Sequence, residues 1–359
     1  MATRVVFFEG GFIVKKSWKA ALLATVAMGT FVLAGCGGDK GASAPAKDAP
    51  TIGYAIYKFD DTFMSGLRAR VEEAAKGKAK VDIVDSQNSQ PKQNEMVDLF
   101  VNKKYKAMGI NVVDRTAAGV IIDKAKAAKI PTVFFNREPE KADMAKWDQV
   151  FYVGAKAEQS GEMQGKILAD YFKKHPEAYK SGDQTMHVVI ITGEPGHQDA
   201  LLRTQYVKES LEKAGVKVDV LAEDTGMWDR VKGQEKMQAF ISRFGNKIDA
   251  VIANNDDMAL GAIEALKAAG YFQNNKFIPV VGVDATAPAV QALKDGTLLG
   301  TVLNDAKNQG DAVFNLTLAL AKGEKLTKET VGFEIVDGKY IWVPYQIVTK
   351  ETADKIISK

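Results

Sequence analysis

The chain has 359 residues, 46% of them hydrophobic and 26% charged, which is enough for more than one globular core. Its 48 basic and 45 acidic residues nearly cancel, so net charge gives no reason to expect nucleic acid or an anionic membrane face as a partner. A single cysteine excludes any disulfide within the chain.

The N-terminus carries the pattern of an export signal. Three lysines precede the apolar run 20–33, which has the length of a signal core and is short for a membrane span. Ala34 and Gly35 then stand directly before Cys36, an order typical of bacterial lipoproteins. We therefore predict that residues 1–35 are a lipoprotein signal region and that Cys36 is the lipidation site. The alternative is an apolar start followed by a buried free cysteine.

The residues after the cysteine have the composition of a tether. After Cys36, residues 37–50 consist of Gly, Ala, Ser, Pro, Lys and Asp without apolar periodicity, so residues 36–50 are typical of a flexible tether. The fold is expected to begin near Thr51, in the periplasm or at the outer cell face, held to a membrane through lipid. Without residues 1–35 the chain has 44 basic and 44 acidic residues and no net charge.

From Thr51 onward, short β-branched runs alternate with amphipathic helical stretches. Continuous apolar strands joined by helices indicate parallel sheets covered on both faces. The predicted fold class is therefore α/β, with two doubly wound parallel-sheet lobes. The predicted strands are 51–57, 81–84, 107–110, 132–135, 187–192, 216–221, 250–253, 279–283 and 299–303.

Polar side chains follow most of these strands, where doubly wound sheets bind their ligands. Asp, Asn, His and Arg offer the planar donors and acceptors that suit hydroxyl groups. Taken singly, each such residue is more often a helix cap or a solvated loop residue. Phe63 could be a core residue, whereas Trp228 lies in a loop and could pack on the apolar face of a sugar ring. The polar candidates are Tyr57, Asp61, Asn111, His197, Asp199, Arg203, Asn255, Asp284 and Asn304.

At these residues the chain resembles the galactose/glucose-binding proteins of Mgl-type ABC sugar importers. The motifs that carry the resemblance are YKFDDTFM from Tyr57, GEPGH from Gly193, MWD from Met227, VIANND from Val251 and GTVLNDA from Gly300. The similarity extends from about Thr51 to the C-terminus. It implies sugar contacts at Tyr57, Asp61, Phe63, Asn111, His197, Asp199, Arg203, Trp228, Asn255, Asp284 and Asn304.

The resemblance also implies a role for each contact. Phe63 and Trp228 would sandwich the sugar ring, and Asp61 would accept from the 4-hydroxyl of either galactose or glucose. The other residues would contact the remaining oxygens of the sugar. Asp199 and Arg203 would lie at the anomeric end, and Asn111 and His197 near the ring oxygen and 6-hydroxyl. The 2- and 3-hydroxyls would be bound by Asn255, Asp284 and Asn304.

The family has a closing hinge that the chain crosses three times. By that guide one lobe comprises 51–130 and 304–341, and the other comprises 131–303 and 342–359. Ile130-Pro131 fits a crossover, because a residue before proline avoids the helical conformation. The expected partners are a monosaccharide and the permease of an ABC importer, with a chemoreceptor as a further partner in some relatives. We expect a monomer that binds no nucleic acid.

One stretch departs from the family. Many relatives carry a calcium loop, but the corresponding residues 179–185 retain only Asp183 as an anionic ligand, with Asp249 as its distant partner. Calcium prefers six to eight oxygens, several of them anionic, and Lys180 would repel a cation. We therefore predict no tight calcium site and no other cofactor.

Other functions remain open at this point. A glycosidase would use two of Asp61, Asp199 and Asp284 as acid and base, but their expected Asn and Arg neighbours favour ionised acceptors. A sugar-responsive repressor core would need a DNA-binding headpiece where the export signal stands. A binding protein for ribose or a signalling sugar is the remaining alternative. The prediction is thus a sugar receptor and not an enzyme.

Overall fold

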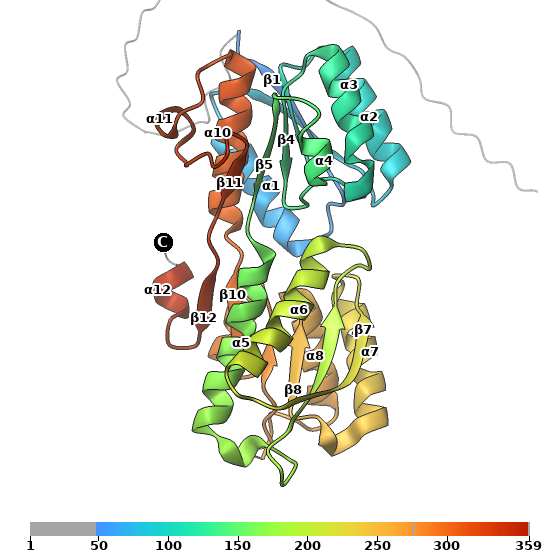
Figure 1. Ribbon diagram of the computed structural model, residues 1–359, viewed down its shortest axis with the longest axis vertical. Coiled ribbons are helices and arrows are strands. Elements are labelled where there is room, and N and C mark those ends of the chain that lie inside the picture. The colour runs from blue at the N-terminus through green and yellow to red at the C-terminus, as the bar shows by residue number, and fades with distance from the viewer. Residues whose placement is uncertain (1–47, 275, 358–359) are drawn as a thin grey trace, which may run out of the picture. The chain divides into compact units, whose positions relative to one another are not determined.

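The computed structural model describes residues 48–274 and 276–357. The predicted signal region, Cys36 and most of the predicted tether lie outside these residues. Within the described part, no helix has the length and apolar character needed to cross a membrane. The described residues form two lobes, each built on a six-stranded sheet (Figure 1).

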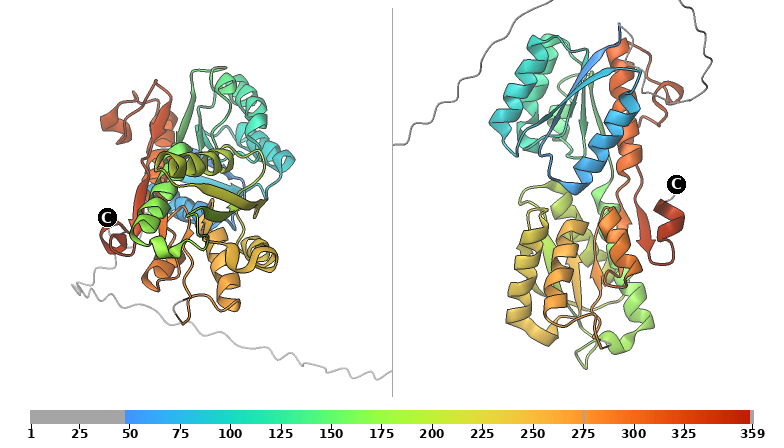
Figure 2. Two further views of the ribbon diagram at one scale, coloured as in Figure 1. Left: turned by 60° about the horizontal axis from the view of Figure 1, so that its bottom comes forward. Right: turned by 180° about the vertical axis from the view of Figure 1, so that it is seen from behind.

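The first lobe contains a wholly parallel sheet in the order β11-β5-β4-β3-β1-β2. Its strands are β1 (Thr51–Ile56), β2 (Lys80–Asp85), β3 (Ala107–Ile110), β4 (Thr132–Phe135), β5 (Val150–Gly154) and β11 (Tyr340–Trp342). One face packs on α1 (Thr62–Ala75) and α10 (Ala306–Lys322), which lie side by side in Figure 2, and the other packs on α2 (Gln90–Asn102) and α3 (Ala118–Ala128).

The second lobe repeats this plan in the order β12-β10-β9-β8-β6-β7, with β12 antiparallel at the edge. Its strands are β6 (Met186–Thr192), β7 (Val218–Thr225), β8 (Ala250–Ala253), β9 (Val280–Val281), β10 (Gly300–Leu303) and β12 (Gln346–Thr349). Its main helices are α5 (Ala157–Lys174), α6 (Gln198–Lys213), α7 (Arg230–Phe244), α8 (Asp256–Ala268) and α9 (Ala287–Lys294). The short helices of the described part are α4 (Lys141–Met144), α11 (Lys328–Val331), α12 (Ala353–Ile357) and three 3₁₀ turns, η1 (Arg115–Ala117), η2 (Pro176–Ala178) and η3 (Gly245–Lys247).

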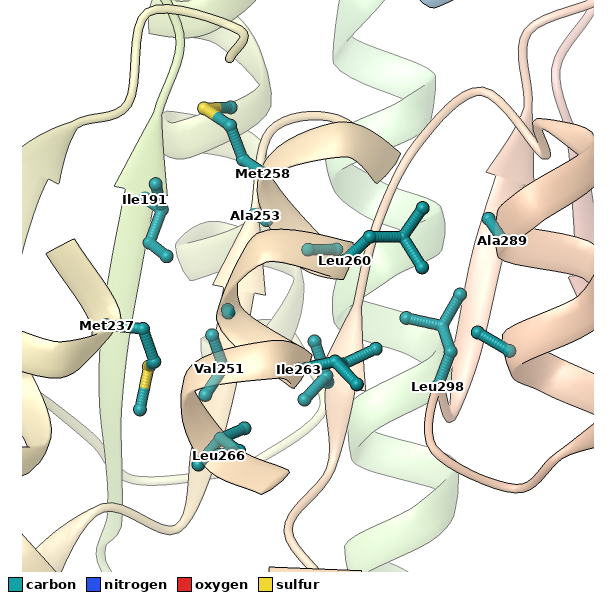
Figure 3. Packing of buried hydrophobic residues seen from close by; sticks show 14 of the residues in the cluster. Ile191, Met237, Val251, Ala253, Met258, Leu260, Ile263, Leu266, Ala289 and Leu298 are labelled. Atoms are coloured by element: carbon teal, nitrogen blue, oxygen red, sulfur yellow. The ribbon is translucent and has the colours of Figure 1, made fainter. Parts of the chain in front are cut away.

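Each sheet has a core on both faces, which is why its strands are apolar without alternation. Figure 3 shows one of these cores, where Ile263 and Leu266 of α8 face Val251 of β8 and Met237 of α7 lies beside them. Strands buried in this way fix the register of the sheet and hold the loops at its carboxyl edge. The predicted α/β class with two doubly wound lobes is confirmed.

The chain passes between the lobes after β5, between β10 and α10, and between β11 and β12. Our expectation that the first crossover lies at Ile130-Pro131 is wrong, because β4 pairs with β3 and β5 pairs with β4 in the first sheet. Proline restricts the preceding Ile130 to extended backbone. Such backbone is found both in a hinge and in the residues that lead into a strand, so the proline does not distinguish the two. Residues 132–154 therefore belong to the first lobe.

Candidate ligand-binding site

A cavity lies between the lobes, where the carboxyl ends of both sheets meet. Its volume is about 350 Å³, including the space at its open mouth. Ten of the eleven predicted site residues line it. The lining residues are Tyr57, Asp61, Phe63, Met64, Asn136, Arg137, His197, Asp199, Arg203, Trp228, Asn255, Asp284 and Asn304.

The first lobe contributes an acidic and an aromatic side chain from the start of α1. Asp61 is the N-cap of that helix, and its Oδ1 accepts a hydrogen bond from the backbone N–H of Met64 at 2.8 Å. Its Oδ2 accepts from the Tyr57 hydroxyl at 2.5 Å. These two donors fix the carboxylate, and the first turn of the helix brings Phe63 to the same wall of the cavity.

The first turns of α6 contribute three polar residues. Asp199 and Arg203 stand four residues apart on one helical face, and Arg203 Nη2 donates to Asp199 Oδ2 at 3.1 Å. Burial lowers the pKa of His197 well below its usual value, and the guanidinium groups of Arg137 and Arg203 lower it further. The neutral ring accepts from the Asp199 N–H through Nδ1, so the proton is on Nε2, which remains a donor.

Trp228 lies in the loop before α7, in a left-handed conformation with φ of 62°. Its ring makes an edge contact with His197, with 5.1 Å between ring centroids. Gly193 allows this placement, because a Cβ on that residue would lie 2.0 Å from the indole ring. A loop with unfavourable backbone conformation and a glycine beneath it thus directs a large ring to the cavity wall, where it also packs on the core of the second lobe.

Asn255, Asp284 and Asn304 follow three neighbouring strands of the second sheet. Asn255 caps α8 and donates to the Trp228 carbonyl at 3.3 Å, which ties two parts of the wall together. Asn304 donates to Asp284 Oδ1 at 3.2 Å. Burial raises the pKa of Asp284, and Arg203 opposes that effect.

Asp256 lies behind this wall and is fully buried. Its Oδ1 accepts from the Thr301 hydroxyl at 2.6 Å and its Oδ2 from the Thr286 N–H at 2.8 Å. The two bonds hold the turn at Asp284 and Ala285, whose φ angles are 122° and 53°. The sequence offers this residue as well, because it directly follows Asn255 after β8, but it is not among the predicted sugar contacts.

The structure does not bring Asn111 to the cavity wall. Its side chain is fully buried, with Oδ1 accepting from the Tyr57 N–H at 3.2 Å and Nδ2 donating to the Phe135 carbonyl and to Asn136 Oδ1, both at 3.1 Å. The amide is therefore engaged on both sides. It fixes the loops that carry Tyr57 and Asn136.

Asn136 and Arg137 are lining residues that sequence reasoning missed. They directly follow β4, so the rule that polar residues after a strand form the site would have found them. Arg137 stacks on the Tyr57 ring, 3.8 Å from its centroid, and its Nη2 lies 2.9 Å from Glu194 Oε2 of the second lobe. A second contact across the cleft joins the Thr62 hydroxyl to Asp257 Oδ2 at 2.5 Å.

Several buried donors on the cavity wall have no hydrogen-bond partner among the described residues. They are Arg137 Nε, Arg203 Nε and Trp228 Nε1. A buried donor without a partner costs free energy, so a ligand that offers acceptors to these nitrogens would remove that cost. The cavity thus offers aromatic surface together with donors and acceptors from both lobes, which suits a small neutral ligand rich in hydroxyl groups.

The two candidate metal ligands, Asp183 in the loop 179–185 and Asp249 directly before β8, already have partners. Asp249 Oδ1 accepts from the Lys180 N–H at 2.9 Å and Oδ2 from the His187 N–H at 2.7 Å. The Lys180 ammonium donates to the Ile248 carbonyl beside them. Asp183 accepts from Thr185, and its hydrogen bonds lower its pKa to about 2. In the described part of the chain, no group of three or more His, Cys, Asp or Glu side chains is placed to hold a metal.

Two lobes that meet over a polar cavity define a solute-binding protein of the type that closes around its ligand. Residues 52–325 match the profile of the family described as "Periplasmic binding protein domain", and the chain belongs to that family. The expected resemblance is thereby confirmed, and membership of the family places the protein outside the cytoplasm.

Individual relatives support the same assignment. The D-galactose/methyl-galactoside binding periplasmic protein MglB of Haemophilus influenzae is 42% identical over 336 residues, covering 93% of this chain and 97% of that protein. A putative rhizopine-binding protein of Rhizobium meliloti is 34% identical, over 85% of this chain and 92% of that protein. The crystal structure of an ABC transporter solute binding protein from Bacillus halodurans with bound myo-inositol matches with a TM-score of 0.73 at 30% identity, covering 87% of this chain and 99% of that one.

Proposed function

We propose that the protein captures D-galactose or D-glucose between its lobes and delivers the sugar to the permease of an ABC importer. The observation that carries this proposal is the cavity itself, where ten predicted sugar-contact residues from both lobes converge. The identity of 42% to a D-galactose/methyl-galactoside binding protein supports the choice of hexose. A receptor for another monosaccharide is the alternative, because ribose import binding proteins of about 30% identity also match.

In this proposal each group on the cavity wall contacts a different part of the sugar, through ring stacking or a hydrogen bond. Phe63 and Trp228 come from opposite lobes and would cover the two apolar faces of the ring. Hydrogen bonds from the Tyr57 hydroxyl and the Met64 N–H fix the orientation of the Asp61 carboxylate. A carboxylate held in this way is suited to accept a hydrogen bond from the 4-hydroxyl. The unpartnered nitrogens of Arg203 and Trp228 would gain acceptors from the ligand. We place Asn111 behind the contacts, as a residue that positions Tyr57 and Asn136.

Closure of the cleft would be linked to binding. The ion pair between Arg137 and Glu194 and the hydrogen bond between Thr62 and Asp257 form only when the lobes meet. A sugar that bonds to both lobes favours the same arrangement, so ligand and cross-lobe contacts stabilise one closed state. The closed state is the form that we expect to dock on the permease, and a chemoreceptor is a further candidate partner. We expect the protein to act as a monomer.

We propose no catalysis at this site. Burial raises the pKa of Asp199 and Asp284, a property that a general acid would also show. Each carboxylate nevertheless has a fixed donor, Arg203 for Asp199 and Asn304 for Asp284, which fits an acceptor better than a proton carrier. Incubation with nitrophenyl glycosides checks this: release of nitrophenol that tracks the purified protein would favour a glycosidase.

We also propose that residues 1–35 are a lipoprotein signal and that Cys36 carries the lipid. The support is the sequence pattern, since these residues lie outside the described part. Mass spectrometry of the purified protein tests it: an N-terminal peptide that begins at an acylated Cys36 is expected, and an unmodified thiol there contradicts it.

We propose that the loop 179–185 binds no calcium tightly. Asp249 is satisfied by two backbone N–H groups and the Lys180 ammonium lies beside it. Isothermal titration with calcium is expected to show no micromolar site, and such a site would contradict the proposal.

A thermal-shift panel of monosaccharides, with and without a chelator, tests the proposed ligand. Galactose and glucose should raise the melting temperature more than ribose, xylose or myo-inositol, because ligand that binds only the folded state stabilises it by mass action. A larger shift with ribose or myo-inositol would indicate that this compound, and not a hexose, is the ligand. The chelator should change nothing.

A further inference from the structure

The first lobe carries a concentration of lysines at the end away from the cavity, which we call the lysine end. It comprises the loops 76–80 and 103–106, with three lysines each, the loop 129–131 with one, and the turn 322–325 with two. Glu324 is the one acidic residue in these four segments. All nine lysines are exposed. The loops that lead from α1, α2 and α3 into the next strands lie at the top of Figure 1. Six of them form no ion pair with any described residue; the others pair with Glu73, Asp82 and Glu324.

The topology explains why lysines that are distant in sequence come together. The first three segments lead from α1, α2 and α3 into β2, β3 and β4, and parallel strands begin at the same edge of a sheet. A lysine in the last turn of a helix is ordinary, because it complements the helix dipole. That explanation does not cover Lys80, Lys104 and Lys106, which lie beyond the helix ends.

The second lobe shows that the fold alone does not require this charge. Its corresponding segments 213–217, 247–249, 269–279 and 294–297 carry five lysines together with Asp249 and Asp295. The chain as a whole has almost balanced charge, so the asymmetry arises from where the first lobe places its lysines. A local field of this kind acts on partners even where the net charge is near zero.

The chain enters the fold in the middle of the lysine end. Residues 48–51 line a hollow together with Lys103, Lys104, Lys106 and Lys322. The Lys80 N–H donates to the Pro50 carbonyl at 2.9 Å, and the Lys106 N–H donates to the Thr51 carbonyl at 3.0 Å. The proposed lipid site at Cys36 is twelve residues before Asp48. Twelve residues span at most about 43 Å, and a flexible chain of that length averages about 20 Å.

We propose that the lysine end is a contact surface for an anionic phospholipid bilayer, next to which the anchor holds it. The proposal rests on the lipid anchor put forward above, which keeps the lysines near the headgroups, where attraction is strong despite screening by salt. Each lysine close to such a surface strengthens binding roughly fivefold. The cavity lies at the opposite, carboxyl edge of the sheet, so this contact leaves the cleft open to solute.

Vesicle sedimentation tests the surface without the lipid. The probe protein is the chain from Cys36 to Lys359 with Cys36→Ser, which contains all of the residues that the structure describes. It should bind vesicles that contain phosphatidylglycerol, bind pure phosphatidylcholine far less, and dissociate as salt is raised. The triple variant Lys80→Gln, Lys104→Gln, Lys106→Gln should bind the anionic vesicles on the order of a hundredfold more weakly at low salt.

A triple variant of the second lobe is the matched control. Lys213→Gln, Lys217→Gln, Lys247→Gln removes the same charge from exposed sites and should retain the binding. Equal binding to both kinds of vesicle, or an equal loss in the two triple variants, overturns the proposal. Galactose titration of all three proteins separates this result from the proposed function. Sugar affinity should be unchanged in both variants, and a parent protein that binds vesicles but no sugar disproves only the function.

Discussion

The guanidinium of Arg137 and the carboxylate of Glu194 meet at 2.9 Å across the cleft, each almost fully buried. Arg137 follows β4 of the first lobe and Glu194 follows β6 of the second, so the pair can form only when the lobes are together. Arg137 also stacks on Tyr57, whose hydroxyl donates to Asp61. A chain of direct contacts therefore joins the cross-lobe ion pair to a wall of the ligand cavity.

Glu194→Gln should weaken sugar binding by roughly tenfold to a hundredfold, because the closed state loses a charged acceptor for Arg137 while the open state loses little. Calorimetric titration measures the affinity. Glu177→Gln is the control, since it changes an exposed contact with His175 in the same lobe and should have no effect. Equal affinities in wild type and Glu194→Gln would show that the pair does not support closure.

Gly193→Ala should weaken sugar binding by about tenfold or more while the protein remains folded. The added methyl group would lie 2.0 Å from the Trp228 ring, so the ring must leave its place on the wall. Tryptophan fluorescence during titration reports both effects. Gly182→Ala has nothing within 4 Å of its added methyl and serves as the control. An unchanged affinity would mean that the position of the ring is unimportant.

Asp61→Ala should reduce the affinity for galactose by more than about a hundredfold, because the hydroxyl of the ligand and that of Tyr57 both lose a charged acceptor in a buried site. Asp60→Ala, one residue earlier and largely exposed, should bind as the wild type does. Circular dichroism establishes that both variants are folded. Retained affinity in the Asp61 variant contradicts the proposed site.

The buried carboxyl of Asp256 should make stability depend on pH. Burial raises its pKa to about 7, whereas the unfolded chain has an ordinary aspartate pKa of about 3.9. Between these values the folded state binds a proton that the unfolded state releases, so the free energy of unfolding falls as pH rises toward 7.

Asp256→Asn cannot ionise and lacks this contribution. Urea unfolding between pH 5 and pH 8, the range around the raised pKa of about 7, should show the stability of the wild type falling relative to this variant and then levelling off. Asp123→Asn, at a mostly exposed position, keeps Asp256, so its stability should differ from that of the wild type by a constant amount over this pH range. A constant difference between wild type and Asp256→Asn would contradict the raised pKa.

Most of the fold could be predicted from the sequence because buried parallel strands read as separate apolar runs. β5 was missed although it is apolar throughout, and β11 and β12 were missed because three- and four-residue strands carry little periodicity. The misplaced crossover at Ile130-Pro131 had a local cause, since proline restricts its neighbour without indicating which sheet comes next.

The sequence predicted the site residues that follow strands or lie in the family motifs, and ten of them line the cavity. Arg137 could not be paired with Glu194 from the sequence, because no periodicity relates two loops on different lobes. The sequence also could not show that Asn111 lies behind the cavity wall, because its position depends on the hydrogen bonds of its amide with the backbone of Tyr57 and Phe135. Net charge gave no sign of the lysine end, since the asymmetry appears only after the sheet gathers its loops at one edge.

The central claim is tested most directly by calorimetric titration of the chain from Cys36 to Lys359, carrying Cys36→Ser, with D-galactose. One galactose should bind per chain in a saturable manner, and Asp61→Ala should abolish the signal. A folded protein that binds neither galactose nor glucose nor any other simple monosaccharide would contradict the account.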